Sequence, residues 1–131
     1  MYPVKQKAPV MTKQAPEAIG PYSQGVMAGD FLFVSGQLPI DPAKGTFVEG
    51  DIKDQTRQVF ENIKAIASAA KTDMNHIVKT TVFLKDMSDF QAMNEVYSEY
   101  FSGVLPARSA IQAARLPKDA TIEIETVFYL H

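Results

Sequence analysis

The segment TIEIETVFYL, residues 121–130, most constrains the fold of this chain, because its side chains alternate as those of a β-strand do. Successive side chains of a strand point to opposite faces of a sheet. One face therefore carries Ile122, Ile124, Phe128 and Leu130, and the other carries Glu123, Glu125, Val127 and Tyr129. Apolar groups lie on both faces of this predicted strand, so both faces need a cover.

Two segments have the apolar period of a helix. From about Asp51 to residue 70, apolar residues recur along one side and charged residues lie opposite. A second helix is predicted to begin at Ser88 and to end by Gly103. The Ser88 side chain can cap the amide of Gln91 while Gln91 reaches back, which forms a capping box.

The other regular segments are β-branched or aromatic and are predicted strands. They cover residues 22–27, 31–37, 76–84, 108–114 and 121–130, with a loop predicted at 41–50. The order ββαβαββ predicts an α+β fold in which two helices pack on one face of a mixed sheet. Two helices cannot cover both faces, so the apolar second face predicts an oligomer.

Length and charge narrow the class of protein. At 131 residues the chain can bury one core, which predicts a single domain over 1–131, with residues 1–14 as a loose arm. A net charge of −2 provides no basic field, so neither nucleic acid nor a membrane is an expected partner.

The sequence has no cysteine, which excludes disulfides and thiolate chemistry. No segment is typical of a signal peptide or a membrane span, and a cytoplasmic location is expected.

Arg108 is the most informative candidate for a functional residue. It lies in LPARSAIQAARLP, in a run that predicts a buried strand, where a cation is costly unless an anion meets it. The connection ARLPKDA would let the strands of Arg108 and Glu123 pair antiparallel, so that both side chains face one cleft. An arginine can clamp a carboxylate and a glutamate in a partly dry cleft can move a proton, which suits hydrolysis or isomerisation of a small organic acid. The alternative is a structural ion pair between the two residues, which is commoner in sheets.

Other polar and aromatic residues give weaker signals. Ser35 has no evident base, which favours hydrogen bonding or packing over a nucleophilic role. Tyr22 fits a core aromatic as well as a ligand contact, and Asn94 is either solvent-exposed or an inward amide that needs a partner. His76 is predicted to be a surface or capping residue and His131 is terminal, so no metal site is expected.

Six blocks of the sequence together resemble one known family. They are AIGPYSQG, FVSGQLP, QTRQVFENIKAI, VKTTVFLKDMSDF, MNEVYSEYF and PARSAIQAARLPKDATIEIE, and they extend from about Ala15 to the end. The chain resembles the RidA/YjgF family of reactive-intermediate deaminases. That resemblance implies a chorismate-mutase-like fold, a homotrimer with clefts between subunits, and no cofactor. It also implies hydrolysis of 2-imino acids and their enamine tautomers, such as 2-iminobutanoate and 2-iminopropanoate, to 2-oxo acids and ammonia.

The resemblance also implies roles for particular residues. Arg108 would bind the substrate carboxylate, and Glu123 would orient and deprotonate the attacking water. The backbone around Ala110 would hold that water or the imine nitrogen. Many relatives have cysteine at this position, yet we expect the activity to survive because backbone atoms act there. The cleft would be lined by Tyr22, Ser35, Gly36 and Asn94.

Two alternatives come from other classes of function. A non-catalytic trimeric regulator that binds small carboxylates would keep Arg108 but would not need Glu123 as a base. An endoribonuclease or translation inhibitor has been proposed for relatives, but the net negative charge and the lack of a basic stripe disfavour it.

Overall fold

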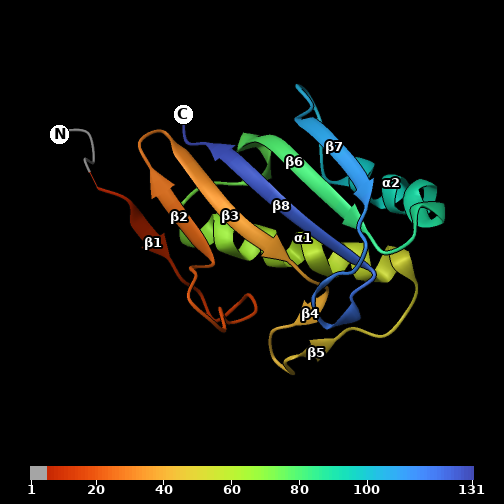
Figure 1. The fold of residues 1–131 in the computed structure, drawn as a ribbon. Coiled ribbons are helices and arrows are strands. Elements are labelled where there is room, and N and C mark those ends of the chain that lie inside the picture. Colours follow the sequence, from red (N-terminus) through yellow and green to blue (C-terminus); the bar gives the residue numbers. More distant parts are fainter. Residues whose placement is uncertain (1–5) are drawn as a thin grey trace.

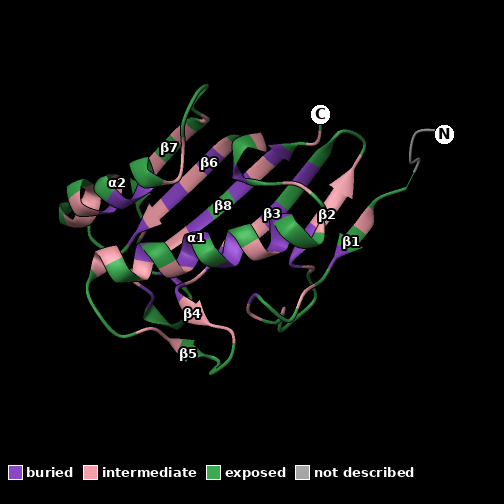
Figure 2. Cartoon of the chain, turned by 180° about the vertical axis from the view of Figure 1, so that it is seen from behind, coloured by how far each residue is buried: buried purple, intermediate pink, exposed green. Residues whose placement is uncertain are grey.

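The backbone forms a six-stranded mixed sheet with two helices on one of its faces (Figures 1 and 2). It is seen in a computed structural model that describes residues 6–131. In spatial order the strands are β1 (Ala8–Val10), β2 (Gly25–Ala28), β3 (Phe31–Gln37), β8 (Ile122–Tyr129), β6 (Ile77–Leu84) and β7 (Ala107–Gln112). All neighbours pair antiparallel except β6 and β7, which are parallel. The predicted α+β class and the seven predicted elements are confirmed.

Helix α1 (Ile52–Ala69) lies across the back of the sheet, as Figure 2 shows. Its first turn is closed by a capping box in which Asp51 accepts from the amides of Lys53 and Asp54, while Asp54 accepts from the amide of Asp51. The apolar side predicted from the sequence is buried against the sheet and includes Val59, Phe60, Ile63, Ile66 and Ala67.

Helix α2 (Phe90–Glu99) begins two residues later than predicted, and the predicted capping box at its start is wrong. A 3₁₀ turn, Met87–Asp89, precedes the helix, and Asp86 caps that turn by accepting from the amide of Ser88 at 2.9 Å. Ser88 therefore lies inside the turn rather than at the helix boundary. An aromatic cluster joins α2 to α1, with ring centroids 4.6 to 5.7 Å apart among Phe60, Tyr97, Tyr100 and Phe101.

The N-terminal segment differs from the loose arm expected over residues 1–14. Residues 1–5 lie outside the described part of the chain, but Ala8–Val10 adds strand β1 to the edge of the sheet. The buried Gln24 side chain explains this order. Its Oε1 accepts from the amide of Thr12 at 2.7 Å, and its Nε2 donates to the carbonyls of Thr12 and Pro16. A polar side chain that is 3% exposed thus satisfies the backbone of the segment after β1.

The predicted loop at 41–50 contains a small hairpin, formed by β4 (Ile40–Asp41) and β5 (Thr46–Phe47). Asn62 of α1 holds it in place, because its buried amide donates to the carbonyls of Leu38 at 3.1 Å and Ile40 at 2.9 Å. Two further 3₁₀ turns, Met74–His76 and Pro117–Asp119, precede β6 and β8.

The two faces of the sheet differ as the alternation of β8 predicts. Ile122, Ile124 and Phe128 are fully buried on the helix side. The opposite face, here called the open face, carries large apolar side chains that remain 40 to 48% exposed, namely Phe31, Phe33, Ile111 and Tyr129. Within residues 6–131, no helix has both the length and the hydropathy needed to cross a membrane.

Candidate functional site

The sheet order separates the two strands that carry Arg108 and Glu123. Strand β6 lies between them, so the predicted antiparallel pairing of β7 with β8 is wrong. Arg108 is opposite Thr80 and Glu123 is opposite Phe83 on the shared neighbour. Strands β7 and β8 are two strand spacings apart, and the register positions of the two residues along β6 differ by three residues. The Cα atoms of Arg108 and Glu123 are therefore about 14 Å apart.

Arg108 and Glu123 also lie on opposite faces of the sheet. Thr80, the register partner of Arg108, is fully buried on the helix side, where its hydroxyl shares a 2.8 Å hydrogen bond with Tyr97 of α2. Glu123 alternates with the buried Ile122 and Ile124, so its side chain points to the open face. The alternative of a structural ion pair between Arg108 and Glu123 of the same chain is therefore excluded.

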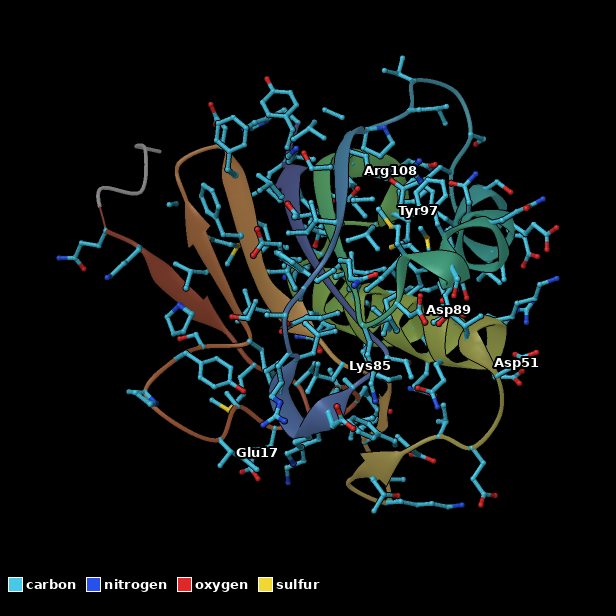
Figure 3. The ribbon with its side chains drawn as sticks, turned by 45° about the vertical axis from the view of Figure 1, so that its right-hand side comes forward. Glu17, Asp51, Lys85, Asp89, Tyr97 and Arg108 are labelled. Atoms are coloured by element: carbon cyan, nitrogen blue, oxygen red, sulfur yellow. The ribbon has the colours of Figure 1, made fainter. Side chains whose placement is uncertain are left out.

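The Arg108 guanidinium is held by neutral groups of α2. Its Nη1 donates to Asn94 Oδ1 at 2.6 Å, and its Cζ lies 4.6 Å from the ring centroid of Tyr97 and 5.3 Å from that of Phe90. Figure 3 shows Arg108 beside Tyr97, between β7 and α2. Phe90, Asn94 and Tyr97 share one face of the helix by their spacing. Among residues 6–131, no carboxylate lies within ion-pair distance of Arg108, so its charge is unmatched.

Glu123 occupies a surface pocket of about 790 Å³ beside the end of β3. Partial burial raises the pKa of the Glu123 carboxyl, and the nearby charge of Glu125 raises it further. The pairing of β3 with β8 shifts register between Val34 and Gln37, and Gly36 lies in this irregular stretch. A Cβ at Gly36 would overlap the Glu123 carboxylate. Glycine at this position therefore lets the carboxylate lie against the backbone.

The remaining candidate residues fall into two groups. Tyr22, Ser35 and Gly36 line the pocket with Glu123, and these four residues are called the Glu123 group. Asn94 and Ala110 lie with Arg108 on the other face, and these three are called the Arg108 group. Ala110 is half-buried in β7, one alternation from Arg108, and packs against the core.

The structure decides several alternatives that the sequence left open. The Ser35 hydroxyl donates to the carbonyl of Ser23 at 2.6 Å, so the predicted hydrogen-bonding role is confirmed. Tyr22 is 53% exposed and is not a core aromatic. The inward partner of Asn94 is Arg108. His76 lies 3.1 Å from Asp73 at a turn, and His131 lies 2.8 Å from Asp30.

Phe90 and Tyr97 were not among the site residues predicted from the sequence. Their spacing with Asn94 was the signal that all three face one neighbour. Burial raises the pKa of the Tyr97 phenol, which keeps the hydroxyl protonated. Tyr97 therefore meets Arg108 as a neutral ring face.

The fold and the two groups define a class: a small α+β protein with an unmatched, half-buried cation on one sheet face and a half-buried carboxylate on the other. A family model described as Endoribonuclease L-PSP matches residues 12–129. The chain belongs to this family, which includes the RidA proteins. The family assignment made from the sequence is thus confirmed.

Three relatives illustrate the match. A RutC family protein from Pyrococcus horikoshii is 59% identical over 94% of this chain and 98% of its own length. A Salmonella typhimurium protein named 2-iminobutanoate/2-iminopropanoate deaminase is 49% identical over 90% of this chain and 94% of its own. The crystal structure of E. coli TdcF with bound serine has 45% identity and a TM-score of 0.89, and it covers 93% of this chain and 98% of that one.

Proposed function

We propose that this protein hydrolyses 2-imino acids and their enamine tautomers, with 2-iminobutanoate and 2-iminopropanoate as substrates, to 2-oxo acids and ammonia. The observation that carries the proposal is the unmatched charge of Arg108. Within the part of the chain that the structure describes, this half-buried guanidinium is held by one amide and two rings alone, which leaves paired donors for a carboxylate. The name of the Salmonella relative and the serine bound to TdcF support a small amino-acid-derived substrate.

A site that uses both Arg108 and Glu123 needs two copies of the chain. Within one copy the sheet separates the two side chains, and a molecule the size of 2-iminobutanoate cannot reach around it. The Arg108 group of one copy would therefore meet the Glu123 group of the next. The open face, with exposed Phe31, Phe33 and Tyr129, supplies the apolar surface for such contacts. Repeating this head-to-tail contact around a threefold axis gives the homotrimer that we propose.

The chemistry needs positioning and one proton carrier. Arg108 binds the carboxylate, which presents the imine carbon to a water molecule beside Glu123. Glu123 takes a proton from the water as the water oxygen bonds to that carbon, the C=N π electrons move to nitrogen, and Glu123 passes the proton to that nitrogen. The hydroxyl of the tetrahedral intermediate then gives up its proton to nitrogen through Glu123 while the C–N bond breaks, so that ammonia leaves and the C–O bond becomes the carbonyl of the 2-oxo acid. The raised pKa of Glu123 makes it a stronger base than an ordinary glutamate and lets it return the proton to nitrogen.

The backbone around Ala110 and the cleft residues Tyr22, Ser35, Gly36 and Asn94 have supporting parts in this proposal. Asn94 fixes the guanidinium, and Gly36 makes room for the Glu123 carboxylate. The Ala110 backbone would hold the water or the imine nitrogen. Alanine in place of cysteine leaves those backbone atoms unchanged and enlarges the cleft slightly.

The test uses a dehydratase that releases 2-iminobutanoate in the presence of semicarbazide, which traps the imine. Added wild-type protein is expected to lower semicarbazone formation, while Arg108→Ala is expected to lose this effect. Glu123→Ala is expected to bind 2-oxobutanoate but to turn over poorly. An Arg108→Ala variant that equals the wild type would refute the carboxylate clamp.

The same wild-type and variant proteins also test the two alternative functions, a carboxylate-binding regulator and an endoribonuclease. A regulator would bind 2-oxobutanoate without lowering semicarbazone formation. An endoribonuclease would cut a single-stranded RNA, which a protein with a net charge of −2 is not expected to do.

A further inference from the structure

We infer that Tyr97 is a positioning residue, which holds the guanidinium of Arg108 ready for the carboxylate because Thr80 fixes its ring. This inference rests on the proposed function. It concerns a residue that cannot itself touch the substrate, since Tyr97 is only 8% exposed and lies behind Arg108.

The ring of Tyr97 is the nearer of the two rings that contact the guanidinium. Cζ of Arg108 lies 4.6 Å from its centroid, well within the distance of about 6 Å at which a cation is attracted to a ring face. Phe90 is more distant at 5.3 Å, and Asn94 engages one nitrogen only. Tyr97 thus limits the movement of the guanidinium toward the helix, while Asn94 fixes one of its nitrogens through a hydrogen bond.

The position of the Tyr97 ring is in turn set by the sheet. Thr80 of β6 is fully buried, lies in register with Arg108, and shares the 2.8 Å hydrogen bond with the phenol. The rings of Phe60 and Phe101 pack on Tyr97 with centroids at 5.6 and 4.7 Å. Arg108 and Thr80, the residue that fixes the Tyr97 ring, are register partners on the neighbouring strands β7 and β6. The same pair of strands therefore positions both the guanidinium and the ring that it contacts.

A restrained guanidinium matters for binding more than for the chemical step. Arginine loses considerable rotamer freedom when it pairs with a carboxylate, and a side chain that is already ordered loses less. Loosening Tyr97 is therefore expected to raise the KM for the imino acid and to leave kcat nearly unchanged.

The sheet offers a matched control for this test. Thr126 of β8 lies directly opposite Thr80, is 2% exposed, and its hydroxyl has no hydrogen-bond partner in the described residues. Thr80→Val and Thr126→Val thus make the same chemical change on neighbouring strands, and only the first removes a partner of Tyr97. We expect Thr80→Val to raise KM about three- to tenfold, the effect of one ordinary hydrogen bond, and Thr126→Val to match the wild type.

Substitutions at Tyr97 separate the ring from its hydroxyl. Tyr97→Phe keeps the platform and loses the bond to Thr80, so its KM is expected to follow that of Thr80→Val. Tyr97→Leu removes the ring face and is expected to raise KM further. Melting temperatures identify any variant whose fold has been lost, and such a variant is then replaced in the comparison by Thr80→Val.

A readout that needs no turnover is the NMR signal of the Arg108 Nε–H group, assigned by its loss in Arg108→Lys. Stacked on Tyr97, this signal is expected to be shifted by the ring and to show slow rotation of the guanidinium. Thr80→Val is expected to move the signal, and Thr126→Val is not. A folded Thr80→Val protein with an unchanged signal would overturn the inference even if the enzyme is active.

The two proposals can fail separately. Should the wild type show no hydrolysis, the affinity for 2-oxobutanoate replaces KM as the measure, and the proposed reaction alone is refuted. In Thr80→Val, the Arg108 NMR signal could move while KM and the affinity for 2-oxobutanoate both stay at their wild-type values. This result would overturn the positioning role, because the orientation of the guanidinium would then not matter for binding.

Discussion

At the scale of single residues, burial gives Glu123 and Arg108 opposite tasks. The groups that contact the Arg108 guanidinium are neutral, so they leave its charge free for a ligand. Burial instead raises the pKa of the Glu123 carboxyl and thereby favours its protonated form. Arg108 can thus bind an anion, and Glu123 can exchange a proton.

The pKa of Glu123 predicts a pH dependence of stability. Burial raises it above its ordinary value of 4.5, so the folded state binds the proton more tightly than the unfolded state does. This contribution to stability is fully present below 4.5 and is lost as the pH rises through the folded pKa. Glu123→Gln stays neutral, and we therefore expect its melting temperature to gain on that of the wild type as the pH rises. Thermal denaturation across this range measures the difference, with exposed Glu49→Gln as the control. A constant difference would show that the pKa of Glu123 is not raised.

At the scale of elements, β6 organises the sheet, because both β7 and β8 pair with it. The sequence could predict these strands from their β-branched residues, but the short connection after residue 113 favoured a hairpin of β7 with β8. The chain instead crosses the end of β6. Local patterns indicate which residues form strands, whereas the order of strands depends on which pairings bury the most apolar surface over the whole sheet. The strand order also determines that Arg108 lies on the helix side of the sheet and Glu123 on the open face.

Helix α1 contributes Phe60 and four other apolar residues to the buried core, and it packs on α2. Phe60 is fully buried and stacks on Tyr100 at 4.6 Å while its edge meets Tyr97. Phe60→Ala leaves a large cavity, and we expect it to lower the free energy of unfolding by about 3 to 5 kcal/mol. Chemical denaturation measures this loss, and Lys64→Ala, an exposed change on the same helix, is expected to be nearly neutral. Equal effects of the two substitutions would contradict the assigned packing.

At the scale of the whole molecule, the open face connects fold and function. The need for a cover on this face could be predicted from the sequence, since Val127 and Tyr129 alternate with buried residues of β8. The sequence could not predict which residues meet when this face is covered. The proposed contact joins two copies of the chain, and spacing along one copy does not relate them. The separation of the Arg108 group from the Glu123 group became visible only in three dimensions.

A site shared between copies predicts complementation. Arg108→Ala and Glu123→Ala are each expected to be inactive, yet a co-refolded equal mixture is expected to recover activity. With random assembly, about one quarter of the sites join an intact Arg108 to an intact Glu123 from the neighbouring copy. Turnover of the mixture against each variant refolded alone is the measurement, and light scattering checks that the mass is that of three chains. An inactive mixture of correctly assembled proteins would show that the two residues do not act in a common site.

The neutral cage around Arg108 has a practical consequence. A guanidinium without its own counter-ion attracts any small anion that fits, so phosphate, sulfate or formate in a buffer will compete with the substrate. Apparent affinities should therefore be compared only at matched anion composition, and simple inorganic salts become the first inhibitors to examine.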